Sequence, residues 1–161
     1  MTNRATMANG PVVSPGKYRT LNRISVALQE NRIKLHTLQQ YFQVDDTVNI
    51  TNPAGMAGEE LRVDMLTIHA KRRAVDNFRK LVDDAPIACS DAVFGGLCSA
   101  MAVVTDEQKK AGVLVIDIGG GTTDFTLYHD GFIQAAGSFA VGGDHVTNDI
   151  SVGLQIPLVQ A

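Results

Sequence analysis

The chain has 161 residues and a formal net charge of −3, with 45% hydrophobic and 19% charged residues. This mixture is typical of a soluble globular protein with about one ordinary domain and a real core. The small negative charge gives no global signal for a nucleic-acid or anionic-membrane partner.

Two cysteines, Cys89 and Cys98, are too few for a disulfide framework, and their apolar neighbours predict reduced, buried side chains. The N-terminus lacks the apolar core of a signal peptide, and no run approaches the ~20 apolar residues of a membrane-spanning helix. These features predict a cytoplasmic protein. The basic groups at 71–73 and 79–80 are interpreted as solvated helix faces.

The first half of the chain predicts strands, turns and a helix. Residues 1–19 are polar and rich in Gly, Pro, Ser and Thr, which predicts a poorly ordered lead-in. Alternating apolar residues at 32–46 and at 61–69 predict two strands that each bury one face. Residues 51–58 between them have turn chemistry. Apolar residues spaced like one helix stripe from 74 to 82 predict a helix.

A short strand at 87–93, a helix of small residues at 95–104 and a polar connector at 105–112 are expected next. The change in composition at Gly112 marks a candidate domain boundary.

The last third has the clearest order of elements. A buried strand at 113–116 leads into a glycine loop at 119–122. A second strand through 125–128 ends in an Asp-Gly hairpin turn, and a third strand spans 132–140. A helix then opens at Gly142.

The segment Asp117-Ile-Gly-Gly-Gly-Thr-Thr-Asp124 carries the strongest chemical signal. Glycine lets the backbone approach phosphate oxygens, and successive turn amides bind an anion. A carboxylate at the end of a strand is placed to hold magnesium through its water molecules. The helix that follows directs its positive N-terminal dipole at the same site. The candidate phosphate-binding residues are Gly119, Gly120, Gly121, Thr122, Thr123, Gly142 and Gly143, and the candidate metal ligand is Asp117.

Other glycine motifs fit this segment less well. A dinucleotide-binding motif needs a third glycine where Asp124 stands and a helix where a strand follows. A Walker loop needs a lysine, which this segment lacks. A glycine-rich turn without a ligand is the plain structural alternative.

This motif, its hairpin and Val141-Gly-Gly-Asp-His-Val-Thr-Asn-Asp-Ile150 resemble the second phosphate loop and following helix of the actin-like ATPases, which include heat-shock chaperones, MreB and sugar kinases. Upstream, the chain resembles the small extra subdomain of the bacterial cell-division family FtsA. Three segments carry that resemblance, Leu35-His-Thr-Leu-Gln-Gln-Tyr-Phe-Gln-Val-Asp45, Asn52-Pro-Ala-Gly-Met-Ala-Gly58 and Leu61-Arg-Val-Asp-Met-Leu-Thr-Ile-His69. The PilM family, which organises type IV pili, has the same layout and is the nearest alternative.

The resemblance implies an α/β fold: an actin-like (ribonuclease H-like) half-lobe with a mixed sheet, plus a small α+β extra subdomain. It assigns 20–86 to part of the extra subdomain, 87–111 to the end of the first lobe and a connector, and 112–161 to the start of the second lobe. The first phosphate loop, the adenosine-binding segment and the C-terminal amphipathic helix of the family have no counterpart in the sequence. The resemblance therefore implies an internal fragment.

Members of this family bind ATP between two lobes, and the resemblance implies that Asp117 holds hydrated magnesium while the candidate glycines and threonines wrap the β- and γ-phosphates. No catalytic base is identified, and His145 is interpreted as a surface or packing residue. For Asp124, Asp144 and Asp149, a structural role and a role in the site both remain open. The complete protein is expected to hydrolyse ATP slowly or only to bind it, and the fragment to be inactive.

The resemblance also implies partners. FtsA-like proteins form filaments and anchor the tubulin-like FtsZ, so FtsZ, other division proteins and further copies are expected partners, without nucleic acid. Membrane contact is expected only through a segment absent from this sequence, which makes the complete protein cytoplasmic and peripheral to the inner membrane. A nucleotide-free interaction module at 33–82 is a second hypothesis. A sugar- or acetate-kinase-like phosphotransferase is disfavoured because the first phosphate loop is missing.

Overall fold

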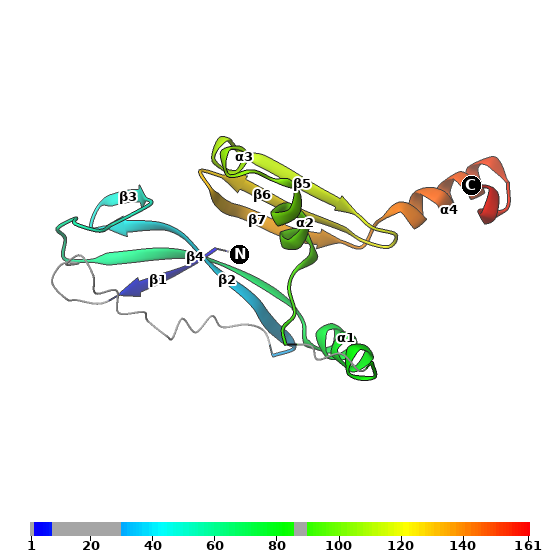
Figure 1. Ribbon diagram of the computed structural model, residues 1–161, viewed down its shortest axis with the longest axis horizontal. Helices are drawn as coiled ribbons and strands as arrows, with labels where there is room; N and C mark the ends of the chain where they lie inside the picture. The colour runs from blue at the N-terminus through cyan, green and yellow to red at the C-terminus, as the bar shows by residue number, and fades with distance from the viewer. Residues whose placement is uncertain (1, 8–29, 86–89) are drawn as a thin grey trace. The chain divides into compact units, whose positions relative to one another are not determined.

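Figure 1 shows the computed structural model of the chain, which describes residues 2–7, 30–85 and 90–161. The chain divides into two compact units, Met1–Ala92 and Val93–Ala161. Each unit contains a small sheet, so the fold is a mixture of α and β structure as predicted. The expected mixed sheet is not what the described residues form, because every strand pair in them is antiparallel. Parallel neighbours require a long crossover connection, and here the second sheet is joined by short turns.

The sheet of the first unit has the strand order β1-β4-β2-β3. Its strands are β1 (Thr2–Met7), β2 (Arg32–Val44), β3 (Thr47–Ile50) and β4 (Leu61–Lys71). The long central strands β2 and β4 confirm the two strands that the alternating pattern predicts. Two register shifts interrupt their pairing, which explains why the alternation of buried and exposed residues is imperfect along β2.

Residues 2–7 differ from the expected poorly ordered lead-in. They form β1 at the edge of the sheet and pair antiparallel with Leu61–Leu66 of β4. Ladder hydrogen bonds come from the backbone, so an edge strand forms here without the apolar alternation that would reveal it in the sequence. The rest of the expected lead-in, residues 8–19, lies outside the described residues.

The predicted turn region between β3 and β4 is confirmed, and one carboxylate organises it. Asp45 accepts hydrogen bonds from the amides of Glu59 (3.0 Å) and Glu60 (2.8 Å). Earlier in the loop, the amide of Ala54 donates to the side chain of Asn52 (3.0 Å), as in a local Asx turn.

Helix α1 (Arg72–Asp83) confirms the predicted apolar stripe, but most of that stripe is exposed. Val75 is buried, whereas Phe78 is 71% and Leu81 69% exposed. A strand expected at 87–93 lies partly outside the described residues, and 90–93 contain no strand.

The second unit contains the predicted order of strand, loop, strand, turn, strand and helix. Its sheet has the order β5-β6-β7, and the turn between β6 and β7 has positive φ at Asp130 (53°) and Gly131 (82°). These angles fit a two-residue hairpin turn. The elements are α2 (Gly95–Val103), α3 (Asp106–Ala111), β5 (Val113–Ile118), β6 (Thr123–His129), β7 (Phe132–Phe139), α4 (Gly143–Leu154) and the short 3-10 helix η1 (Leu158–Gln160).

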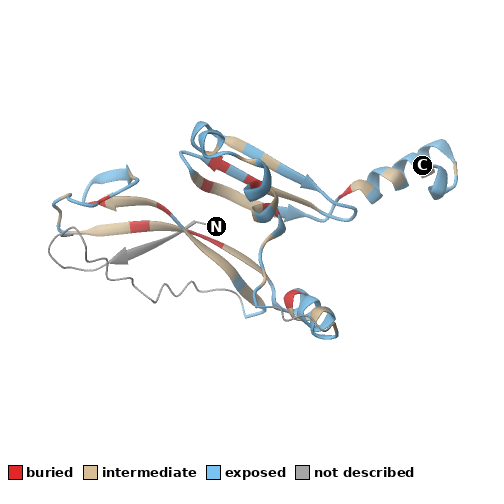
Figure 2. Ribbon diagram, viewed as in Figure 1, coloured by how far each residue is buried: buried red, intermediate tan, exposed pale blue. Residues whose placement is uncertain are grey.

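Helix α2 packs on all three strands of this sheet and α3 packs on β6, and the buried residues of the sheet are Thr126, Tyr128 and Ile133. The other face is apolar and open, as Figure 2 shows by the exposed stretches of β5. Leu114 is 53%, Ile116 55% and Ile118 69% exposed. The prediction of a fully buried strand at 113–116 is therefore wrong in the described chain, because β5 is an edge strand covered on one face only.

Two further expectations are corrected. The polar connector contains helix α3, which begins with a capping box: the Gln108 amide donates to the Thr105 hydroxyl, and the Thr105 amide donates to the Gln108 side chain. Cys98 is exposed rather than buried, since α2 turns Gly96 and Ala100 towards the sheet. Cys89 lies outside the described residues. The two compact units divide between Ala92 and Val93, and the candidate boundary at Gly112 stays a prediction.

No helix in the described part of the chain is long and apolar enough to cross a membrane.

Candidate functional site

The turn between β5 and β6 presents a row of backbone donors. Its closing hydrogen bond runs from the amide of Gly119 to the carbonyl of Thr122 (2.9 Å). Among the residues that the structure describes, nothing accepts a hydrogen bond from the amides of Gly120, Gly121 and Thr122. Three successive amides without an acceptor are suited to binding an anion.

The start of α4 holds this turn in place. The amide of Gly143 donates to the carbonyl of Gly119, and the amide of Asp144 donates to the carbonyl of Gly120, both at 2.9 Å. The first amides of a helix have no partner within the helix, so these contacts satisfy two of them. The helix N-terminus expected to point at a phosphate thus binds the turn directly. It positions the free amides on the turn instead of offering its own.

Gly142 cannot be replaced by a larger residue without moving the turn. A Cβ at this position would lie 2.4 Å from the carbonyl oxygen of Gly119 and 2.3 Å from that of Gly120. The amide of Gly142 donates to Nδ1 of His145 (3.2 Å), so the imidazole acts as a cap for the start of α4. This fits the interpretation of His145 as a packing residue.

Thr123 is also committed to the structure of the turn. Its hydroxyl donates to the carbonyl of Val141 (2.8 Å), which ties β6 to the start of α4. The exposed Thr122 has no such bond in the described residues, so its hydroxyl is available together with its amide.

Asp117 and Asp124 lie directly opposite each other on β5 and β6, on the face covered by α2. The hydroxyl of Ser99 on α2 donates to the carboxylate of Asp117. A carboxylate oxygen of Asp124 lies 2.8 Å from where a Cβ of Gly95 would be, at the start of α2. Negative charge is favourable at a helix N-terminus, so this position supports a structural role for Asp124 against α2.

The exposed carboxylate of Asp117, with that of Asp124 opposite it, provides oxygen ligands of the kind that hydrated magnesium accepts, so Asp117 suits the implied ion. The residues described contain no group of three or more His, Cys, Asp or Glu side chains that would hold a metal directly.

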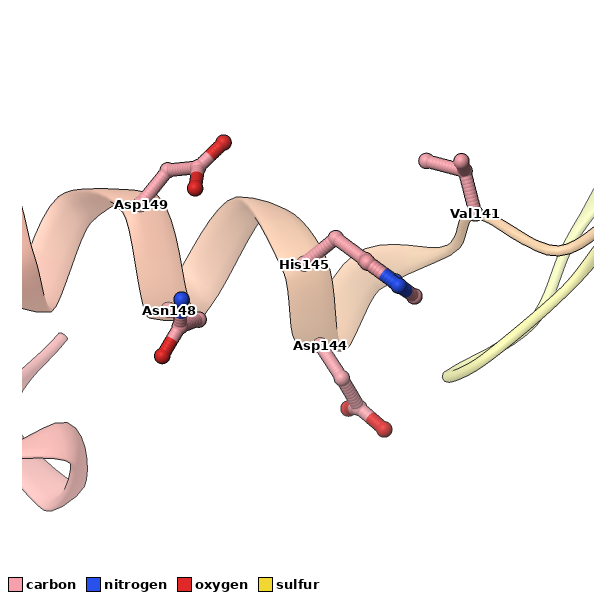
Figure 3. A pocket seen from close by; sticks show the side chains of 5 residues that line it. All are labelled: Val141, Asp144, His145, Asn148 and Asp149. Carbon is pink, nitrogen blue, oxygen red and sulfur yellow. The ribbon is translucent and has the colours of Figure 1, made fainter.

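An open pocket of about 490 Å³ runs along the first turns of α4 and is lined by Val141, Asp144, His145, Asn148 and Asp149 (Figure 3). Asp144 and Asn148 project to one side of the helix, and Asp149 projects to the other. An oxygen of Asp144 lies 3.0 Å from where a Cβ of Gly120 would be, so this carboxylate borders the turn. Asp144 and Asp149 would repel a bare polyphosphate, so a polyphosphate at this pocket would need a cation bound to it.

The structure brings most predicted residues together: Gly119 to Thr123 form the turn that follows Asp117 on β5, and Gly143 is hydrogen-bonded to this turn. A Cβ on Gly142 would overlap the carbonyl oxygens of the turn, so Gly142 lies against it. Sequence reasoning missed Ser99, because its place four residues into a helix of small residues gives no sign of a contact with Asp117. The capping role of His145 could have been predicted from its position three residues after Gly142, where a side chain can reach back to the start of the helix.

Comparison with known proteins identifies the family. The family model described as "Cell division protein FtsA" matches residues 114–161, and that described as "SHS2 domain inserted in FTSA" matches residues 10–69. The cell division protein FtsA of Pseudomonas aeruginosa is 34% identical over 133 residues, which cover 83% of this chain and 32% of the relative. The chain belongs to the FtsA family.

Other FtsA relatives agree. FtsA of Buchnera aphidicola subsp. Acyrthosiphon pisum is 37% identical over 124 residues, covering 77% of this chain and 29% of the relative. FtsA of Escherichia coli strain K12 is 29% identical over 133 residues, which cover 83% of this chain and 32% of the relative. The chain thus spans about a third of the length of the curated FtsA proteins it matches. These comparisons confirm the resemblance to FtsA and do not support the PilM alternative or the nucleotide-free module.

Proposed function

We propose that the chain carries part of the ATP site of an FtsA-like protein, with the phosphates bound at the turn between β5 and β6. One observation carries this proposal: the amides of Gly120, Gly121 and Thr122 follow one another without an acceptor in the described chain, close to the end of β5 where Asp117 lies. The absence of a Cβ on the glycines allows phosphate oxygens to approach these donors closely.

Each predicted residue then has a distinct part in the proposal. Gly119 to Thr123 wrap the β- and γ-phosphates, with Thr123 contributing backbone because its hydroxyl is bonded to Val141. Gly142 and Gly143 support the turn from the start of α4. Asp117, steadied by Ser99, holds the hydrated magnesium ion. When bound, magnesium neutralises phosphate charge, which also reduces the repulsion from Asp144.

The proposal extends to the arrangement of the parent fold. We infer an actin-like, two-lobed protein in which 20–86 belong to the extra subdomain, 87–111 to the end of the first lobe and 112–161 to the start of the second. The matches of one family model to the N-terminal part and another to the C-terminal part support this division.

At the level of the cell, we propose that the protein acts in division by linking FtsZ to the inner face of the membrane and by forming filaments. This places it in the cytoplasm, peripheral to the membrane. The names of the relatives support a role in division.

Capture of purified FtsZ on immobilised chain would test the partner. Absence of capture by the chain, with capture by a curated relative as positive control, would count against a contact in this part of the protein.

The ATP site is tested by the affinity of the chain for a fluorescent ATP analogue with magnesium. Gly121→Ala adds a methyl group where the structure has open space, so the fold should persist while the phosphate loses its approach. Loss of one hydrogen bond to a charged group predicts a reduction in affinity of about tenfold or more. Asp117→Asn should remove most of the dependence on magnesium. Unchanged affinity and magnesium dependence in both variants would contradict the proposal.

A further inference from the structure

Helix α2 approaches the second sheet closely because small residues form its buried side. Gly96 and Ala100 are buried and lie about one helical turn apart. A Cβ at Gly96 would lie 3.2 Å from the Cβ of Asp124 on β6, so a larger residue there would push the helix away from the sheet. This close approach brings the short side chain of Ser99 within hydrogen-bond distance of β5.

The hydroxyl of Ser99 occupies one of the two carboxylate oxygens of Asp117. It donates to Oδ2, and no other group in the described part of the chain donates to this carboxylate. A serine hydroxyl has a single donor, so Ser99 commits that donor to Asp117. Ser99 is half-buried, whereas Asp117 is exposed. The contact therefore fixes one side of an exposed carboxylate to α2 and leaves Oδ1 without a donor.

A fixed orientation of Asp117 needs such a contact, because a second carboxylate lies directly opposite it on β6. That carboxylate belongs to Asp124. Like charges directly opposite each other destabilise a sheet. Helix α2 contacts the two groups at different points, with Ser99 at Asp117 and the start of the helix near Gly95 at Asp124. Ser99 thus holds Asp117 in place against this repulsion.

We propose that Ser99 is a positioning residue that makes the candidate site select magnesium over calcium. The inference rests on the proposed ATP site and on Asp117 as its metal ligand. It adds the reason why one divalent cation is preferred there.

The selectivity follows from how many oxygens Asp117 offers. Calcium binds about six to eight oxygens and often takes both oxygens of one carboxylate, whereas magnesium keeps several of its water molecules. With Oδ2 bound to Ser99, Asp117 offers Oδ1 alone. A single oxygen suits hydrogen bonding from a water molecule of hydrated magnesium, and it disfavours binding of calcium through both oxygens. The exposure of Asp117 leaves room for the water shell.

Affinity for the fluorescent ATP analogue, measured with magnesium, with calcium and without metal, tests this inference. Ser99→Ala removes the hydroxyl, and the fold should persist because Ala has a higher helix propensity than Ser. The affinity with magnesium should fall by about tenfold, since partners that orient a metal ligand commonly contribute this much. The affinity without metal should change much less. The preference for magnesium over calcium should decrease, because both oxygens of Asp117 become available.

Two further variants of α2 serve as controls. Ser99→Thr keeps the hydroxyl and should retain the preference for magnesium. Cys98→Ala changes the neighbouring exposed residue and should behave like the unaltered chain. Circular dichroism checks that each variant remains folded.

The outcomes separate this inference from the proposed function. The role of Ser99 is overturned if Ser99→Ala leaves the ratio of the magnesium and calcium affinities unchanged, or if it lowers the affinity equally with and without metal. The phosphate-binding turn would still stand in either case if Gly121→Ala lowered the affinity in the same assay. Absence of any magnesium-dependent binding by the unaltered chain would overturn both proposals.

Discussion

Gly142 is the residue on which the geometry of the candidate site depends most. It sits where the start of α4 meets the carbonyl groups of Gly119 and Gly120, and only a residue without Cβ fits there. Gly121 is the reverse case, since a Cβ there would meet nothing within 4 Å. Two glycines in one site therefore serve different purposes, one for packing and one for access by a ligand.

Gly142→Ala should destabilise the second unit, because the new methyl group overlaps two carbonyl oxygens. Overpacking of this kind costs about 1–3 kcal/mol. Urea unfolding of the chain measures the effect, with Gly121→Ala as the matched control, expected to change the free energy of unfolding by no more than about 0.5 kcal/mol. Equal stability of the two variants would show that α4 does not hold the turn as described.

The environment of His69 predicts that the stability of the first unit depends on pH. Its pKa in the folded chain is lowered from 6.5, first by burial and then by Arg32. The unfolded chain therefore takes up the proton first as the pH falls. The stabilising contribution of neutral His69 is complete above the unfolded pKa and is lost as the pH falls through the folded pKa.

Melting temperatures measured from about pH 7.5 to about pH 5 test this, because His69→Gln should reduce the loss of stability at low pH. His129→Gln, which changes a largely exposed histidine in the second unit, serves as the control. A pH profile that is the same for the unaltered chain and His69→Gln would rule out this contribution.

At the scale of elements, α3 shows how a short helix forms from local signals. It has a capping box at its start, acidic residues in its first turn and basic residues in its last. Gly112 follows with a φ of 103°, which favours glycine and ends the helix. The helix is therefore specified by its ends rather than by an apolar stripe.

Thr105→Ala should destabilise α3 by about 1 kcal/mol, because the amide of Gln108 loses its acceptor. Thr105→Ser keeps the hydroxyl and should retain most of the stability. Hydrogen exchange of the α3 amides would report the change locally. Equal protection in both variants would indicate that contacts with β6 hold the helix without the cap.

The two faces of β5 differ in exposure, and this difference leads to a second prediction at the scale of elements. Ile116 is 55% exposed on the open face, and Val115 lies on the face that α2 covers. Ile116→Lys should leave stability nearly unchanged and reduce self-association, because a charge on an edge strand opposes strand-to-strand pairing. Val115→Lys should unfold the unit, since it places a charge against α2. Light scattering and thermal unfolding measure both effects, and similar behaviour of the two variants would contradict the assignment of the faces.

These elements also explain what the sequence could predict. The β6–β7 hairpin was predictable because Asp130 and Gly131 adopt the positive φ that their residue types favour. The glycine turn and the start of α4 were predictable because glycine favours turns, and the apolar runs on either side mark where the strands end. The exposure of Ile116 was not, because an apolar run looks the same whether one or both faces are covered. The contact of Ser99 with Asp117 depends on how α2 packs on β5, which no local pattern encodes.

At the scale of the whole molecule, the chain combines two units of opposite net charge and belongs to a family of division proteins. The candidate phosphate turn lies in the acidic second unit, where a polyphosphate is favoured only together with a cation.

The most direct test of the central claim is the amide nuclear magnetic resonance spectrum of the chain during titration with magnesium and ATP. The account predicts that the largest shifts occur at Gly120, Gly121 and Thr122, that they require magnesium, and that Gly121→Ala reduces them. Shifts confined to other parts of the chain, or none at concentrations of ATP up to about 10 mM, where even weak association with a Kd near 1 mM would be visible, would contradict it.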